Sequence, residues 1–354
     1  MDHAQYLHDL IATLIKENGS DLHLSVGRYP AVRVAGQLIF LVKQEVLTRE
    51  QVSGILKVLV NDEKKFALFV ANQEIDFSYS YNNGEARMRG NAFFQKGEVA
   101  VALRLLQKVK TFEELHLPKI LEAFARKKQG FFLCVGPIGQ GKSTTLSSMI
   151  GLINEERSEH ILTIEDPIEY IFEPKRSIID QREVGIDTKD FQTALTSVFR
   201  EDVNVIMVGE MRNPETIATA VTAAETGHLV LSTLHTNNAA QTIDRIIDSF
   251  PAGQQDQIRI QLAGSLLGIF SQRLVPRIAG GRVPAYELLI NNTAVSNLIR
   301  ERRTHEIDVV IETGYENGMI DMNRSLLELV QKGEITMENA YTYSFNPKAL
   351  ERLL

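Results

Sequence analysis

The sequence predicts an α/β protein in two parts, and three observations lead to this prediction. Strand-like and helical segments are mixed over residues 1–106, whereas strands and helices alternate regularly over residues 119–354. Residues 107–118 between them are polar and end in a proline, which predicts a hinge. A glycine-rich loop that joins a strand to a helix lies within the second part. We therefore expect a small N-terminal α+β domain, a hinge, and a doubly wound α/β domain that ends in helices.

The first part opens with apolar residues at helical spacing, such as Leu10 and Leu14, and these predict a helix over residues 1–19. Alternating runs punctuated by glycine and proline then predict strands, and two longer runs predict helices. The expected strands span residues 21–26, 31–34, 37–42, 76–81, 86–94 and 99–105, and the expected helices span residues 45–60 and 63–71. Turns are expected at residues 82–84 and at Lys96-Gly97.

The second part contains four apolar strand-like runs with helical stretches between them. The strands are expected at residues 130–135, 161–164, 205–208 and 229–234. Such alternation is typical of a doubly wound sheet, which binds ligands at the C-terminal ends of its strands. From residue 288 onward the pattern is helical, with helices expected over residues 323–332 and 337–343.

Composition narrows the class of protein. The 354 residues are 44% apolar and 23% charged, as in an ordinary globular protein. The formal net charge of −7 provides no global basic field for nucleic acid or for anionic lipid, so we expect no nucleic-acid partner. A single cysteine, Cys134, cannot form an intrachain disulfide or a cysteine zinc cluster. The start of the chain does not read as a signal peptide and no apolar run is long enough to span a bilayer, so we expect a cytoplasmic protein.

The loop at residues 136–143 reads GPIGQGKS and matches the pattern G-x-x-x-x-G-K-[ST] at each fixed position. A strand-like run precedes it and a helical run follows it, which points backbone N–H groups and a helix N-terminus at a phosphate chain. The lysine would reach the β- and γ-phosphates, and the serine hydroxyl would ligate Mg²⁺. The sequence therefore predicts a site for a nucleoside triphosphate and Mg²⁺. Its expected phosphate-binding residues are Gly136, Gly139, Gly141, Lys142 and Ser143.

Polar side chains follow three of the other predicted strands. Asp166 and Glu169 lie in an acidic stretch directly after the strand at residues 161–164, where a solvated acidic turn is the alternative interpretation. Glu210 follows the next strand and is the carboxylate available there to polarise water. His235 follows a strand expected beside that of Glu210, from which it could sense the γ-phosphate.

These segments together resemble the secretion-type P-loop ATPases, and within them the type IV pilus retraction ATPase (PilT) family. The resemblance covers nearly the whole chain. It includes the phosphate loop and the motifs SDLHLSVG at residues 20–27, TIEDPIEY at 163–170, VGEMRN at 208–213, HLVLSTLHTNNA at 228–239, TIDRIIDSFP at 242–251 and AVSNLIRE at 294–301.

The resemblance implies a homohexameric ring whose subunits have an N-terminal PAS-like domain and a C-terminal RecA-like domain, with ATP between the two. It implies that Thr144 holds the nucleotide together with the lysine and serine before it, and that Asp166 supports the metal. Glu169 would act with Glu210 in activating water, and His235 would report the γ-phosphate. Arginines of the N-terminal domain reach the phosphates in this family. The matching candidates are Arg89 and Arg104.

The family also implies the work that hydrolysis drives. The ring would act on an inner-membrane pilus platform protein, from the cytoplasmic face of that membrane, so that pili retract and the cell moves by twitching. A serine at position 296 and an asparagine at position 204 depart from the family pattern and leave open an accessory, PilU-like retraction motor. An assembly or type II secretion ATPase is a further alternative, against which stand the single cysteine and the missing additional N-terminal domain.

Overall fold

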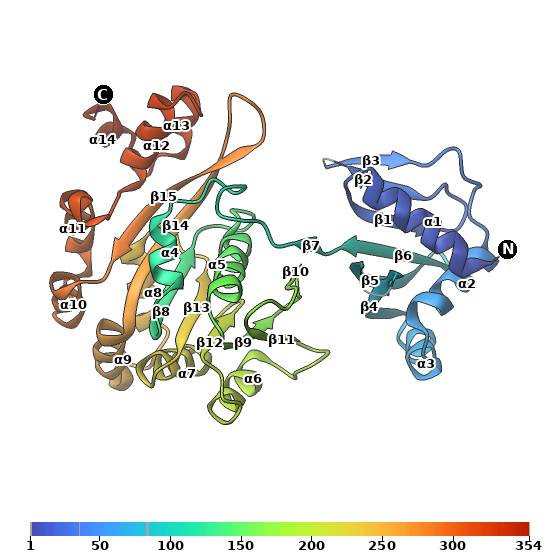
Figure 1. Cartoon of the computed structure of the whole chain (residues 1–354), viewed down its shortest axis with the longest axis horizontal. Coiled ribbons are helices and arrows are strands. Elements are labelled where there is room, and N and C mark those ends of the chain that lie inside the picture. Colours follow the sequence, from blue (N-terminus) through green and yellow to red (C-terminus); the bar gives the residue numbers. More distant parts are fainter. Residues whose placement is uncertain (1, 35, 83–84, 354) are drawn as a thin grey trace. The chain divides into compact units, whose positions relative to one another are not determined.

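The computed structural model describes residues 2–34, 36–82 and 85–353, which form two compact units, Met1–Lys108 and Val109–Leu354 (Figure 1). The residues predicted as the hinge are shared between them. Gln107–Lys108 (β7) ends the first unit, and Phe112 and Leu117 are buried in the core of the second. The turn expected at residues 82–84 lies partly outside the described residues.

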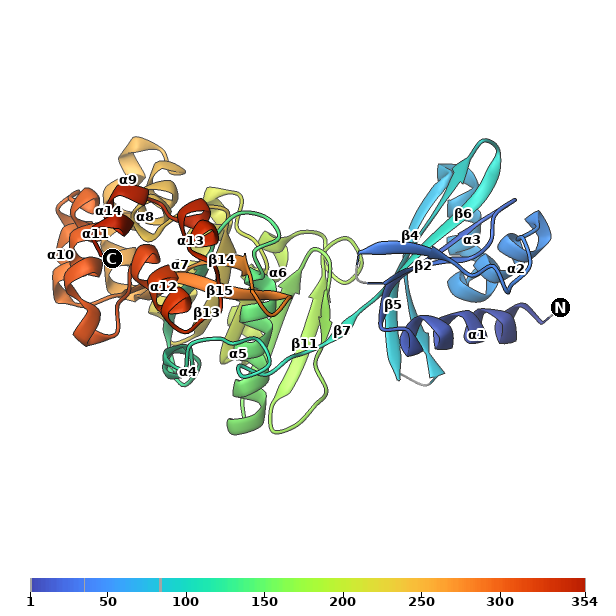
Figure 2. The ribbon, with the colours of Figure 1, turned by 90° about the horizontal axis from the view of Figure 1, so that it is seen from above.

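The first unit contains a six-stranded antiparallel sheet in the order β3-β2-β1-β6-β5-β4. Its strands are β1 (Gly19–Ser25), β2 (Ala31–Val34), β3 (Gln37–Phe40), β4 (Glu74–Tyr81), β5 (Ala86–Gln95) and β6 (Glu98–Leu105). Its helices are α1 (His3–Lys16), α2 (Arg49–Val60) and α3 (Glu63–Asn72). The helices lie on one side of the sheet (Figure 2), and their apolar side chains form a single core with those of that face of the sheet. The other face carries mostly polar side chains, such as Asp21, Arg89 and Arg104.

One predicted helix of the first unit begins later than expected. The prediction began the helix at residue 45, whereas α2 begins at Arg49. Thr48 and Gln51 form a capping box, in which each side chain bonds the backbone N–H of the other residue, and this fixes the helix start.

The second unit is built on a seven-stranded sheet in the order β11-β9-β12-β13-β8-β14-β15, in which only the β14–β15 pair is antiparallel. The strands of this sheet are β8 (Gly130–Val135), β9 (His160–Glu165), β11 (Ile178–Glu183), β12 (Val205–Val208), β13 (Leu229–Leu234), β14 (Leu266–Pro276) and β15 (Arg282–Ile290). The short strand β10 (Tyr170–Ile171) is not part of it. All four predicted strands are present. The prediction missed the edge strand β11 and the long hairpin of β14 and β15.

Helices cover both faces of this sheet, which is the α/β arrangement that the alternation predicted. α4 (Ile120–Ala125) and α5 (Lys142–Glu156) pack in the core on one face. The core on the other face includes α6 (Phe191–Ser197), α7 (Pro214–Glu225), α8 (Ala239–Asp248), α9 (Ala252–Ser265), α10 (Thr293–Arg300) and α11 (Ile307–Thr313). The last helices are α12 (Met322–Gln331), α13 (Met337–Tyr343) and α14 (Pro347–Glu351), and they form a small core with the β14–β15 hairpin.

Candidate nucleotide site

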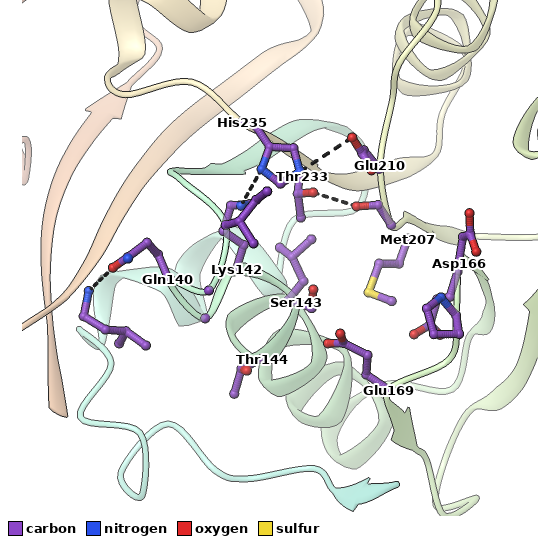
Figure 3. A pocket seen from close by; sticks show the side chains of 18 of the residues that line it. Gln140, Lys142, Ser143, Thr144, Asp166, Glu169, Met207, Glu210, Thr233 and His235 are labelled. Carbon is purple, nitrogen blue, oxygen red and sulfur yellow. Dashed lines mark hydrogen bonds and ion pairs between the residues drawn. The ribbon is translucent and has the colours of Figure 1, made fainter. Parts of the chain in front are cut away.

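A cavity of about 390 Å³ opens at the C-terminal ends of the parallel strands of the second unit (Figure 3). The loop between β8 and α5 forms its floor, and residues that follow β9, β12 and β13 form its wall. Side chains that the sequence separates therefore converge on one space, because parallel strands end at the same edge of a sheet. Predicted site residues among its lining are Gly139, Gly141, Lys142, Ser143, Thr144, Asp166, Glu169, Glu210 and His235.

The phosphate loop has backbone angles that require glycine. Gly136, Gly139 and Gly141 have φ values of 145°, 76° and 78°. A Cβ on Gly136 would also lie 2.5 Å from the carbonyl oxygen of Gln272, so no other residue fits there. Gly141 caps α5 without a side-chain hydrogen bond, which leaves the first N–H groups of the helix available to a phosphate.

Lys142 is almost buried, with 7% of its surface exposed. Its Nζ donates to the carbonyl oxygens of Gly136 and Pro137 at 2.8 and 2.9 Å, and to Nδ1 of His235 at 3.2 Å. Burial lowers the pKa of the ammonium group from its ordinary value. The loop thus holds its lysine beside the histidine that follows β13.

Glu210 and His235 face one another across the ends of the paired strands β12 and β13. Oε1 of Glu210 lies 3.5 Å from Nε2 of His235, and its Oε2 accepts a hydrogen bond from Arg212 at 2.8 Å. The hydrogen bond from Arg212 is the main cause that lowers the pKa of Glu210, so the carboxylate is ionised and can accept a proton. Burial, and next the charge of Lys142, lower the pKa of His235.

The acidic residues at the end of β9 and in the loop after it differ in burial. Glu165 is buried and accepts hydrogen bonds from Thr163 and Gln181, which makes it part of the sheet edge. Asp166 and Glu169 are exposed to the cavity, and Figure 3 shows the Glu169 carboxylate pointing toward the first turn of α5.

The oxygens around the phosphate loop fit Mg²⁺, which takes one or two protein oxygens together with phosphates and water. Exposed Ser143 lies in the first turn of α5, and Asp166 lines the same cavity. Over the described ranges, no three His, Cys, Asp or Glu side chains gather as a metal cluster of their own. Thr144, in contrast, turns its hydroxyl to Tyr170 at 2.7 Å.

Two further residues of the site come from β14, which the sequence pattern did not predict. Gln272 is buried, donates from Nε2 to the carbonyl of Gln140 at 2.7 Å, and accepts at Oε1 from the Thr145 hydroxyl at 2.7 Å. It therefore fastens the second half of the phosphate loop and the first turn of α5 to β14. Arg273 follows it. Arg212 was also missed, although an arginine two residues after Glu210 could have signalled an ion pair.

The candidate arginines Arg89 and Arg104 belong to the first unit. They lie directly opposite one another on β5 and β6, and β1 places Asp21 opposite Arg104. Nε of Arg104 donates to Asp21 at 2.9 Å, and Arg33 lies 3.8 Å from the same carboxylate. Both candidates stand on the polar face of the sheet.

The comparisons with known proteins show the family to which the chain belongs. Residues 3–342 match the family model for type II/IV secretion system proteins. The chain is 44% identical over 335 residues to the type IV pilus retraction ATPase PilT of Pseudomonas aeruginosa, covering 94% of this chain and 96% of PilT. It is 39% identical to the type IV pilus ATPase PilU of the same organism, covering 98% of this chain and 90% of PilU. A crystal structure of the pilus retraction motor PilT with bound ADP is 47% identical, with a TM-score of 0.90 over 98% of both chains.

In the described part of the chain, no helix combines the length and the apolar character that crossing a bilayer requires.

Proposed function

Since the chain belongs to the type II/IV secretion system protein family and to its PilT branch, we propose that it is an ATPase that retracts type IV pili. The observation that carries the proposal is the convergence of Lys142, His235 and Glu210 at one end of a phosphate-loop cavity. A protein that only binds a nucleotide would need the phosphate loop alone. Hydrolysis also needs groups that act on the attacking water and the γ-phosphate, and a carboxylate and a histidine at that end of the cavity would supply them.

Each of these side chains has its own task in hydrolysis. Lys142 neutralises charge on the β- and γ-phosphates as the bond to the leaving group lengthens. Glu210 accepts a proton from the attacking water, with Glu169 as the second carboxylate of the cavity. His235 contacts both Lys142 and Glu210. A γ-phosphate bound beside these residues would change the contacts of His235, so the histidine would respond to whether the γ-phosphate is present.

A bound Mg²⁺ would supply positive charge that stabilises the phosphates during hydrolysis. Ser143 and Asp166 are the residues that would hold it, and Gly136, Gly139 and Gly141 with Thr144 shape the loop around the nucleotide.

The working assembly that we propose is a homohexamer at the cytoplasmic face of the inner membrane, acting on a pilus platform protein. The first unit would serve as the PAS-like domain, which its antiparallel sheet with helices on one face supports. Arg89 and Arg104 would supply positive charge to a nucleotide from the polar face of that sheet. The predicted hinge over residues 107–118 would absorb the motion between the two units.

An accessory, PilU-like motor is the second candidate, because the chain is 39% identical to PilU over nearly its full length. An assembly or type II secretion motor would use the same site to push instead of pull.

Purified protein tests the enzymatic part of the proposal. We expect phosphate release from Mg·ATP by a hexamer, and a loss of about 10²–10⁴-fold in kcat for Glu210→Gln with ATP still bound. Glu215→Gln removes an exposed carboxylate five residues along the chain and serves as the control. Equal turnover by wild type and Glu210→Gln would remove the assigned role of Glu210.

A further inference from the structure

Arg273 is a buried cation whose partners are oxygens of uncharged groups. The residue is 8% exposed. Nη1 donates to the carbonyl of Gln272 at 3.0 Å, and Nη2 donates to the carbonyl and side-chain oxygens of Asn237 at 3.3 and 3.1 Å. Among the described residues no carboxylate lies within ion-pair distance of the guanidinium, although the negative charge of Glu287 acts on it from farther away. Burial of a charge without a close ionic partner is costly, so a structural or functional use must offset this cost.

The guanidinium joins the two loops that hold the reacting end of the nucleotide. On one side, a Cβ on Gly136 would lie 3.1 Å from Nη1 of Arg273, so the group sits against the start of the phosphate loop. On the other side it holds Asn237, which lies two residues after His235. Ser271 donates to the same Asn237 carbonyl at 2.7 Å. The strand β14 therefore fixes the histidine loop relative to the phosphate loop.

The face of the guanidinium is covered by an aromatic ring from the C-terminal helices. The ring of Phe345 lies with its centroid 5.0 Å from Cζ of Arg273. Phe345 lies between α13 and α14, and its own neighbours fasten it there: Ser344 donates to Asn323 at 2.6 Å, and Asn323 donates to the carbonyl of Asn346 at 3.0 Å. Planar stacking on an aromatic ring is a property of arginine that lysine does not share.

We propose that Arg273 is a positioning residue for ATP hydrolysis, which sets His235 relative to the phosphate loop and which Phe345 holds in place from the C-terminal helices. The inference rests on the proposed ATPase function. Its consequence is that the C-terminal helices control the rate of hydrolysis without touching the nucleotide. Displacing a catalytic contact by about 1 Å can lower a rate about 10²-fold while binding persists.

The test uses full-length protein and steady-state hydrolysis of ATP, with kcat and KM measured separately. Phe345→Ala removes the covering ring. We expect kcat to fall about tenfold or more, and KM for ATP to stay within about twofold. Phe345→Tyr keeps the ring and should keep wild-type kcat. Arg273→Lys keeps the charge but loses the planar guanidinium and its forked donors. Its kcat should therefore fall at least as far as that of Phe345→Ala.

Tyr315→Ala is the matched control. Tyr315 also stacks with an arginine in the C-terminal part, with Cζ of Arg324 3.4 Å from its centroid. Within the described part of the chain, neither side chain of this pair forms a hydrogen bond or an ion pair with the phosphate loop or with the loop of His235. An unchanged kcat in Phe345→Ala would overturn the inference. An equal fall in Tyr315→Ala, or a rise in KM with kcat unchanged, would also overturn it. If wild type itself does not hydrolyse ATP, the proposed function fails, which separates that outcome from these.

Discussion

His235 accepts a hydrogen bond from Lys142, with Nδ1 3.2 Å from Nζ. Because an ammonium group has donors only, Nδ1 carries no proton, and the neutral ring holds its proton on Nε2. That nitrogen faces Oε1 of Glu210 at 3.5 Å. The histidine therefore connects the phosphate-binding cation to the carboxylate proposed to activate water, and it does so as one defined neutral tautomer.

This tautomer predicts a pH dependence of hydrolysis. Burial and the charge of Lys142 lower the pKa of His235, so the ring stays neutral at more acidic pH than an ordinary histidine does. Further acidification protonates Nδ1, which then can no longer accept from Lys142. We expect kcat to fall on the acid side as pH drops through the pKa of His235, and His235→Gln to lose this acid limb because its amide does not titrate. His228→Gln, which replaces a histidine bonded to the Ala223 carbonyl, is the control. An acid limb that persists in His235→Gln would assign it to another group.

The arginine face of the first unit provides a second test. Arg104 and Arg33 both approach Asp21, but only Arg104 matches the family arginines. If Arg104 acts on the transferring phosphoryl group, Arg104→Ala should lower kcat by about 10³-fold. Arg33→Ala removes the other partner of the same carboxylate and should leave kcat nearly unchanged. Equal effects of the two substitutions on kcat would mean that both arginines only stabilise the sheet and that Arg104 has no role in hydrolysis.

Gly136 tests the construction of the phosphate loop. Alanine at this position would place a Cβ 2.5 Å from the Gln272 carbonyl, at a φ of 145° that side chains avoid. We expect Gly136→Ala to abolish measurable nucleotide binding, seen by fluorescence of a labelled ATP analogue. Gly264→Ala, in open space within α9, should bind normally and gain up to about 1 kcal/mol in stability. Normal binding by Gly136→Ala would show that the loop has room the structure does not show.

Glu287 predicts a pH dependence of stability. Burial raises its pKa to about 7, against 4.5 ordinarily, beside Asp308, Asp321 and Arg273. Between these two values the folded state holds a proton that the unfolded chain has released, so stability falls as pH rises through this window. Urea unfolding should give a decrease of about 1–3 kcal/mol from pH 5 to pH 8 attributable to this group.

The amide variant Glu287→Gln isolates this effect, because it can still accept the hydrogen bond from the Ala239 N–H but does not titrate. We expect its stability to depend less on pH than that of wild type. Glu316→Gln, at an exposed position of the same part of the chain, should follow wild type. Parallel pH profiles for Glu287→Gln and wild type would contradict the assignment.

The sequence allowed much of this site to be predicted, because its parts follow apolar strands that propensity identifies. β8, β12 and β13 have the predicted bounds, and strand ends in a parallel sheet meet at one edge. That reasoning was enough to place Glu210 and His235 together beside the phosphate loop.

The contributions of β14 could not be predicted in this way. The strand follows α9 directly, with Ser265 ending the helix and Leu266 starting the strand, so no loop separates the two elements. The nearby glycines, Gly264 and Gly268, lie singly inside the helix and the strand and form no turn signal. Gln272 and Arg273 therefore could not be placed in any strand. β11 was missed for another reason, since its sequence IIDQRE at the sheet edge is mostly polar.

The central claim is that hydrolysis at Glu210 drives pilus retraction, and the dynamics of labelled pili in the host test it most directly. A strain that lacks the gene would carry either wild type or Glu210→Gln, and retraction events would be counted. We predict that wild type restores retraction and that Glu210→Gln leaves long, static pili. Equal retraction with both versions, or a loss of all pili on deletion, would contradict the claim, because the motor would then be accessory in the first case and would assemble pili in the second.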